Sequence, residues 1–164
     1  MRLGYDAKRA FFNRSGLGNY SRDVLSMLAE YFPMNEYYLY TPLTPKPLFT
    51  INPTNQRLIT PQKRLHQWLP FYWRSCLLHQ QVESDRIDLF HGLSNEIPFK
   101  MHKTNIPTIV TVHDLIFMRY PHFYNPIDRK IYKEKCFYAA THANRIIAVS
   151  QQTANDLQEF FKIP

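Results

Sequence analysis

Apolar positions recur every three or four residues in several stretches of the chain. This spacing puts apolar side chains on one face of a helix, so each stretch is predicted to be helical. The stretches cover residues 16–32, 61–83 and 126–142, with a last one after Ser150. We expect Pro33 to end the first helix and Pro70 to kink the second, because proline lacks the N–H donor of a helix. Ser150 is well suited to cap the last helix.

Short apolar runs rich in aromatic and β-branched residues lie between these helices and are predicted to be strands. The runs cover residues 1–6, 36–41, 56–60, 86–91, 106–112 and 145–149. Residues 7–15, 41–54 and 94–103 are expected to be loops, the second because it contains four prolines. Alternation of strands with helices predicts an α/β fold, a Rossmann-like doubly wound, mostly parallel sheet flanked by helices.

The whole chain, residues 1–164, is expected to form a single domain, because its length and apolar content are sufficient for one core. It ends at Pro164, directly after a predicted helix, which favours a fragment or one half of a two-domain protein. No apolar run approaches the roughly 20 residues of a membrane span, and the start does not resemble a signal peptide. We therefore expect a cytoplasmic protein, with peripheral contact to the inner face of a membrane as a second option.

Basic residues outnumber acidic ones by 20 to 13, and the net charge of +7 suggests an anionic partner, with a basic surface that has no specific partner as the alternative. Nucleotides, phospholipid surfaces and nucleic acids are the candidate classes. Nucleic acid is disfavoured, because the basic residues are scattered and no helix-turn-helix, RRM or zinc pattern occurs. The two cysteines, Cys76 and Cys136, lack CxxC or metal-type spacing, which argues against a disulfide scaffold and fits a reducing compartment.

Glycines and polar residues follow the predicted strands at their carboxyl ends, where ligands bind in open α/β sheets. They are Arg9, Arg14, Gly16 and Gly18 after the first strand, His91, Gly92, Ser94 and Asn95 after the fourth, His113 and Asp114 after the fifth, and Ser150 after the sixth. Because the carboxyl ends of parallel strands meet at one edge of the sheet, these residues are predicted to gather there.

Each of these residues also has a purely structural interpretation. Gly16 and Gly18 could let a helix N-terminus approach a phosphate, or could simply shape a tight loop. His91 could take part in chemistry, or could bond a backbone carbonyl at the end of its strand. His113 is expected to face the crevice, with Asp114 as a structural hydrogen-bonding residue, because adjacent strand residues point in opposite directions.

Residues 63–79 combine aromatic and basic side chains on one predicted helix. A core helix with solvated charges is the favoured interpretation. The alternative is an interfacial patch that meets a lipid surface or a lipid-linked acceptor.

Five motifs occur in an order that resembles the N-terminal half of family 4 glycosyltransferases, especially the mannosyltransferase-like group that builds bacterial surface polysaccharides. They are Tyr5-Asp-Ala-Lys8, Ser15-Gly-Leu-Gly-Asn-Tyr20, Asp88-Leu-Phe-His-Gly92, Val110-Thr-Val-His-Asp-Leu115 and Ala143-Asn-Arg-Ile-Ile-Ala-Val-Ser150. The resemblance implies one half of a GT-B fold, the acceptor-side domain. Its partner, a C-terminal donor-binding domain, is absent from this chain, so the chain alone is expected not to turn over.

The resemblance further implies a retaining enzyme that transfers a hexose, such as mannose, from a sugar nucleotide to a glycan or lipid-linked acceptor, without a metal or other cofactor. His113 would sit beside the transferred sugar. The donor diphosphate would be approached by Gly16, Gly18 and Arg14, and the cleft would be lined by Arg9, His91, Gly92, Asp114 and Ser150. Asn19 stands where the family often has a basic residue, so Arg9 or Arg14 would have to contact phosphate in its place.

Two other interpretations stay open from the sequence. The chain could be a non-catalytic domain, derived from a transferase, that binds an acceptor or a partner. It could also be a nucleotide-binding Rossmann oxidoreductase domain, although Gly16-Leu-Gly18 lacks the third glycine of that fingerprint and lies far from the strand end.

Overall fold

The computed structural model describes residues 1–45 and 47–163, with the side chains of all but Arg64 and Leu65. Its centre is a six-stranded sheet with the order β3-β2-β1-β4-β5-β6. The strands are β1 (Arg2–Asp6), β2 (Glu36–Tyr40), β3 (Gln56–Ile59), β4 (Leu89–Gly92), β5 (Thr108–Val112) and β6 (Arg145–Ala148). All neighbouring pairs are parallel, which confirms the predicted Rossmann-like fold class.

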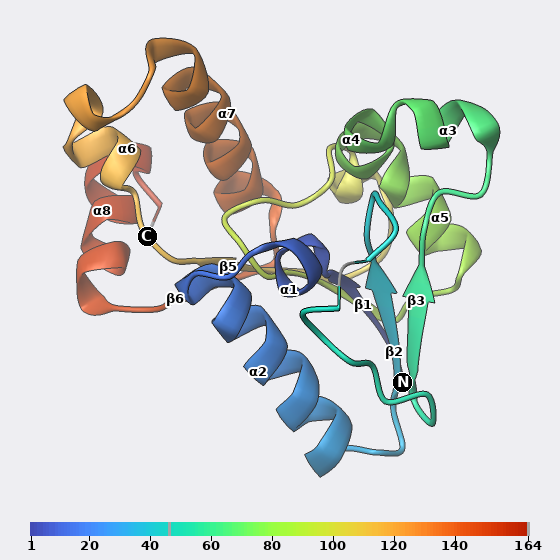
Figure 1. Ribbon diagram of the computed structural model, residues 1–164. Coiled ribbons are helices and arrows are strands. Elements are labelled where there is room, and N and C mark those ends of the chain that lie inside the picture. Colours follow the sequence, from blue (N-terminus) through green and yellow to red (C-terminus); the bar gives the residue numbers. More distant parts are fainter. Residues whose placement is uncertain (46, 164) are drawn as a thin grey trace.

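Helices connect the strands and flank the sheet (Figure 1). They are α1 (Lys8–Phe12), α2 (Gly16–Tyr31), α3 (Arg64–Trp68), α4 (Pro70–Tyr72), α5 (Leu78–Ser84), α6 (Ile116–Arg119), α7 (Pro126–His142) and α8 (Gln151–Phe161). A π-helical turn, η1 (Trp73–Leu77), joins α4 to α5, and two 3-10 turns are η2 (Met101–Lys103) and η3 (Pro121–Phe123). Ser150 caps α8 as predicted, because its Oγ accepts the Thr153 N–H at 3.1 Å.

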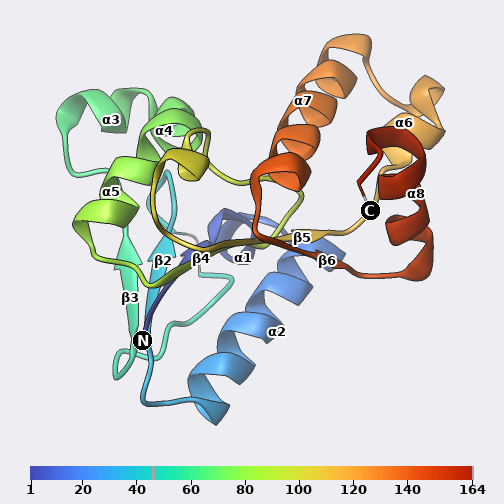
Figure 2. The same cartoon turned by 180° about the vertical axis from the view of Figure 1, so that it is seen from behind.

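The two faces of the sheet bury separate apolar cores, because successive side chains of a strand point to opposite sides. On one face, Tyr5 and Tyr37 pack with Leu25 of α2 and with α1. On the other face, Phe90 and Val110 pack with η1, α5, α7 and α8. Figures 1 and 2 accordingly show α2 and α7 on opposite sides of β5 and β6.

Two predicted segments differ from the structure. The loop predicted over residues 7–15 contains α1, which forms because Ala7, Ala10 and Phe11 are buried at helical spacing against the first core. The helix predicted over residues 61–83 is broken rather than kinked, since α3 ends at Trp68 and Pro70 begins α4. Proline is favoured at the first position of a helix, where its missing N–H has no partner to lose.

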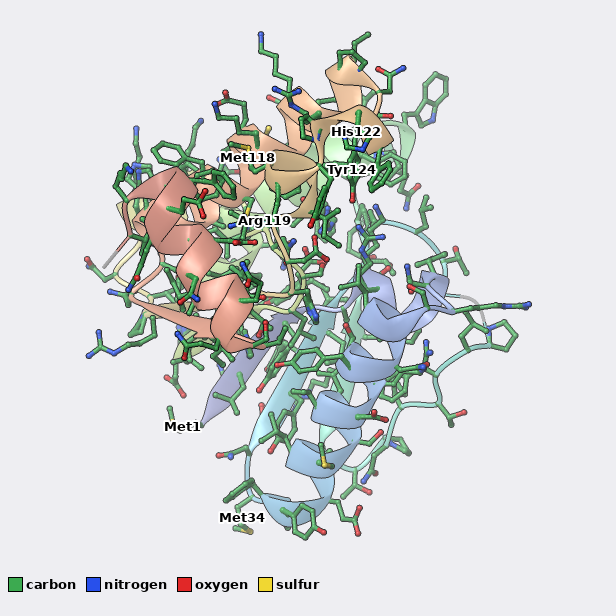
Figure 3. The ribbon with its side chains drawn as sticks, turned by 90° about the vertical axis from the view of Figure 1, so that its left-hand side faces the viewer. Met1, Met34, Met118, Arg119, His122 and Tyr124 are labelled. Carbon is green, nitrogen blue, oxygen red and sulfur yellow. The ribbon has the colours of Figure 1, made fainter. Side chains whose placement is uncertain are left out.

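The strand order reverses between β1 and β4. The chain runs outward from β1 to β3, returns to β4 beside β1, and continues outward to β6. The connections after β1 and β4 therefore leave toward opposite faces, and ligands of open α/β sheets bind in the crevice at this point. Figure 3 shows Met1 and Met34 at the amino end of the sheet, and His122 and Tyr124 at its carboxyl end.

Candidate functional site

A cleft of about 570 Å³ opens at the carboxyl ends of β1, β4 and β5. Its walls are α1, the start of α2, the α4–η1 segment, the loop after β4, and α7, which Figure 1 shows around the same end of the sheet. Charged and amide side chains in the lining are Lys8, Arg9, Arg74, Asn95, Glu96, Asp114 and Lys135. Apolar and aromatic ones are Leu17, Phe71, Phe117, Tyr124, Ile131 and Tyr132. The cleft thus lies where the strand order reverses.

The floor of the cleft is a buried network of charges centred on Arg74. The Arg74 Nε donates to Asp6 Oδ1 at 3.0 Å, and its Nη2 contacts Asp6 Oδ2 and Glu96 Oε1 at 2.5 Å each. Lys135 Nζ lies 2.9 Å from the other oxygen of Glu96. Two cations and two carboxylates are therefore paired, and the network has no net charge.

The network also shifts the pKa values of Arg74 and Glu96. Burial alone would lower the pKa of Arg74, but the negative charges of Asp6 and Glu96 raise it above its ordinary value. Burial alone would raise the pKa of Glu96, but Arg74 and Lys135 lower it to about 2. Arg74 and Glu96 therefore stay charged at neutral pH.

Lys8 and Arg9 are the cations of the cleft that the network leaves unpaired. No carboxylate lies within 4 Å of either side chain's nitrogens among the described residues. Lys8 Nζ lies 4.9 Å from the centre of the Phe71 ring, and Arg9 Nε is buried without a hydrogen-bond partner there. Partial burial, followed by the charge of Arg74, lowers the pKa of Lys8.

The start of α2 is shaped by the connection from α1. Asn13 Oδ1 accepts the N–H groups of Ser15 at 2.8 Å and Gly18 at 3.2 Å, so Asn13 caps the helix from outside it. Arg22 fixes the same connection, because its Nη1 donates to Ala10 O and Asn13 O at 2.9 Å each. These contacts place the first turn of α2 beside the cleft.

The two glycines of this turn differ in what surrounds them. A Cβ on Gly18 would lie 1.8 Å from Asn13 O, so packing of the helix against the preceding connection accounts for this glycine. A Cβ on Gly16 would meet nothing within 4 Å. The N–H groups of Gly16 and Leu17 have no acceptor in the described part of the chain, and Leu17 lines the cleft. The first turn of α2 therefore retains free donors.

His113 is fixed at the end of β5, half-buried beside the cleft. Its Nε2 donates to Leu93 O at 2.9 Å, and its backbone N–H donates to Asn95 Oδ1 at 2.7 Å. Its carbonyl accepts the Thr153 hydroxyl at 2.8 Å, and its ring meets the edge of Tyr20, with centroids 4.8 Å apart. The ring Nδ1 makes no hydrogen bond with the described residues, so it is the free polar atom of His113.

Asp114 and Asn95 complete the end of β5. Asp114 Oδ1 accepts the Ile116 N–H at 3.2 Å and lines the cleft, which agrees with its predicted structural hydrogen bonding. Asn95 was noted in the sequence without a role. Its N–H donates to Thr111 O at 2.9 Å and its Nδ2 donates to Asp114 O at 3.1 Å. With the bond to His113, Asn95 fastens the loop after β4 to β5.

His91 is the clearest correction to the predicted cleft. It is buried in the sheet, where Nε2 lies 2.8 Å from the Thr111 hydroxyl and the ring packs 5.8 Å from that of Tyr5. Its partner is thus neither a ligand nor a backbone carbonyl. Burial lowers the pKa of His91 to about 4, so the ring is neutral at physiological pH.

Six other predicted site residues also lie outside the lining of the cleft. Three of them are direct neighbours of lining residues, since Gly16 and Gly18 flank Leu17 and His113 precedes Asp114. The other three are Arg14, Gly92 and Ser150. Arg14 is exposed on the connection between α1 and α2. Gly92 serves packing, because a Cβ there would lie 2.2 Å from Glu96 O. Ser150 is occupied in capping α8. Of the predicted cleft residues, Arg9 and Asp114 line the cleft.

The sequence prediction missed the charged network. Arg74 stands in a helical stretch whose charges were expected to be solvated, yet its side chain is 5% exposed. Its partners Asp6 and Glu96 are distant in the sequence, and only the folded sheet brings them together. The available signal was an arginine among the apolar residues of a helical stretch, where it could be buried. A buried arginine requires carboxylate partners.

No group of three or more histidine, cysteine, aspartate or glutamate side chains in ranges 1–45 and 47–163 is arranged to hold a metal ion. Within the same ranges, every helix is too short or too polar to cross a bilayer.

Sequence comparisons bear on the class of the protein. No curated protein sequence matches the chain significantly. The profile described as Glycosyltransferase Family 4 matches residues 15–164, which include the start of α2, His113 and most walls of the cleft. This match covers far more than half of the chain, and it agrees with the order of motifs in the sequence. The chain belongs to glycosyltransferase family 4.

Proposed function

We propose that the chain is the acceptor-side domain of a retaining, two-domain glycosyltransferase with a GT-B fold. A hexose such as mannose would pass from a sugar nucleotide to a glycan or lipid-linked acceptor during synthesis of a bacterial surface polysaccharide, at the cytoplasmic face of the membrane. Family membership supports glycosyl transfer. The observation that carries the proposal is the cleft at the strand-order reversal, with His113 and the free N–H groups of α2 beside it.

The start of α2 supports donor binding. Gly16 and Leu17 offer unpaired N–H groups, and the positive end of the helix dipole favours an anion there. As the bond from the sugar to the nucleoside diphosphate breaks, negative charge grows on the leaving phosphate. Donors and dipoles fixed in advance stabilise such charge without a metal. His113 would orient the sugar through its free Nδ1.

The apolar walls support an acceptor with a lipid part. Phe71 and Tyr132 line the cleft and are 54% and 44% exposed. Trp68, Leu69 and Tyr72 lie next to Phe71 in the sequence and are also exposed, Trp68 at 85%. Exposed aromatic side chains of this kind favour the interface between water and lipid. We therefore place the acceptor's entry, and peripheral membrane contact, along this wall.

Transfer of a radiolabelled hexose tests the proposal. The full-length protein, as its host makes it, is given UDP-, GDP- and dTDP-hexoses with a lipid extract of that host. We expect one donor to label an acceptor, and His113→Ala to lower kcat/KM about 100-fold. His142→Ala, an exposed histidine at the far end of α7, is the matched control and should leave the rate unchanged.

Three outcomes would contradict parts of this proposal. No transfer with any donor would favour a non-catalytic, acceptor-binding domain. Normal kinetics of His113→Ala, with unfolding unchanged, would remove His113 from the reaction. Transfer by the 164-residue chain alone would show that no second domain is needed.

A further inference from the structure

We propose that Lys8 and Arg9 form a subsite for a phosphate group of the acceptor. This inference rests on the proposed function, because it assigns a charge to the molecule that would enter the cleft as acceptor. The proposed acceptor is therefore a sugar attached to a phosphate or diphosphate ester, and not a neutral glycan.

The charges of the cleft carry the argument. Arg74 and Lys135 are matched by Asp6 and Glu96, so the floor beneath the cleft is neutral. Lys8 and Arg9 then add two cations, while Asp114 is the remaining carboxylate of the lining. A partly buried cation is costly without an anion beside it. The fold therefore keeps a net positive charge in a cavity large enough for a ligand.

The geometry of Arg9 and Lys8 suits phosphate. Both are consecutive residues of α1, and both line the cleft. Arg9 Nε is a buried donor without a partner in the described part of the chain, so no other group of the protein there holds it. A guanidinium binds phosphate through two parallel N–H donors, whereas an ammonium adds a compact point charge.

The position of Lys8 assigns the phosphate to the acceptor. Lys8 Nζ lies over the ring of Phe71, a cleft residue in a short segment, residues 68–72, that is rich in exposed apolar side chains. The groups assigned to the donor, the first turn of α2 and His113, belong to other elements and are held by Asn13 and Asn95. A lipid-linked sugar has both a phosphate and an apolar part, so it matches both features of this site. A soluble sugar phosphate matches only the cations.

Binding of inorganic pyrophosphate to the 164-residue chain tests the subsite directly, by calorimetry at low salt. We expect Lys8→Gln and Arg9→Gln each to weaken binding about tenfold, since each removes a charge-assisted contact. Arg57→Gln removes the same charge from an exposed position on β3, outside the cleft lining, and should weaken binding less than about twofold. Equal weakening by all three variants, or no binding by the unaltered chain, would overturn the inference. Thermal unfolding of each variant checks that it is folded.

Two further measurements are needed, one to distinguish a lipid phosphate from a soluble sugar phosphate and one to distinguish failure of the subsite from failure of the proposed function. The first is binding to vesicles of phosphatidic acid in phosphatidylcholine. If a lipid carries the phosphate, Lys8→Gln should bind these vesicles more weakly than the unaltered protein. If a soluble sugar phosphate is the acceptor, the two proteins should bind them equally. In the full-length enzyme, Lys8→Gln should raise the acceptor KM about tenfold and leave the donor KM unchanged. A rise in the donor KM alone would overturn the inference and leave glycosyl transfer intact. Pyrophosphate binding without any transfer would instead overturn the proposed function alone.

Discussion

Replacement of Arg74 by methionine tests whether the paired charges beneath the cleft hold the fold together. Methionine fills similar space without a charge, so Asp6 and Glu96 would lose the guanidinium that both contact. Lys135 would still neutralise Glu96 in part, whereas Asp6 would stay buried without a counter-charge. An uncompensated buried charge costs about 3–5 kcal/mol, and we expect a loss of this size at neutral pH.

The pKa of Glu96 gives a second measure of the same interaction. The difference between an ordinary value of 4.5 and about 2 in the fold corresponds to about 3 kcal/mol, part of it from Lys135. The folded-state pKa is the lower one, so this stability is complete above pH 4.5 and is lost as pH falls toward 2. In Arg74→Met, Glu96 loses the guanidinium that lowers its pKa while burial still raises it, so acid should remove less stability from the variant than from the unaltered protein.

Urea unfolding at pH 7 and at about pH 4 measures both effects. We expect Arg74→Met to lose about 3–5 kcal/mol at pH 7, a fall in Tm of roughly 6–20 °C, and clearly less at pH 4. Arg57→Met is the control, because Arg57 pairs with Glu36 on the surface and should lose less than about 1 kcal/mol. A loss no larger than the control's, or an equal loss at both pH values, would refute the reasoning.

Three further substitutions or titrations test the fold around the cleft. Gly18→Ala should cost more than about 2 kcal/mol in urea unfolding, because its Cβ would meet Asn13 O, whereas Gly16→Ala should not destabilise. Asn95→Ala should cost about 2–3 kcal/mol, since it removes the side-chain bonds to His113 and Asp114 and places alanine at a φ of 57°. Asn95→Gly loses the same bonds without the backbone strain and should cost less. His91 should titrate near pH 4 by NMR, and stability should fall by about 3 kcal/mol as pH drops from 6.5 toward 4, because the unfolded chain takes up the proton first. An NMR midpoint near 6.5 would contradict its burial.

Local patterns were sufficient to predict most of the elements. Helical spacing identified α2 and α7 within a residue or so of their ends, and Ser150 caps α8 as expected. These signals are local because helix periodicity and capping depend on residues a few positions apart. The sequence failed at α1, which is stabilised by tertiary burial of Phe11 and lies in a segment of mixed polarity.

The candidate site was less predictable, because it depends on contacts between distant residues. The carboxyl ends of the strands were placed well enough to find Arg9 and Asp114. Strand order and twist determine whether a residue at a strand end faces the cleft or a core of the sheet. His91 was predicted to line the cleft but is buried against Thr111. The pairing of Asp6 with Arg74 bridges 68 positions, which no local pattern could reveal.

The contrast between Arg74 and Arg9 separates charges that stabilise the fold from a charge kept for a ligand. Arg74 joins the end of β1 to the loop after β4, and Lys135 extends this link to α7, so the network ties together walls that diverge where the strand order reverses. The Arg9 side chain makes no hydrogen bond or ion pair with the described residues. Lys8 is partly buried and lies near Arg74, and both effects disfavour its charged form. Removing a charge from the network should therefore cost stability, whereas Lys8→Gln should leave stability unchanged or raise it while weakening phosphate binding. A residue whose replacement improves the fold and harms binding is one that the fold retains for its ligand.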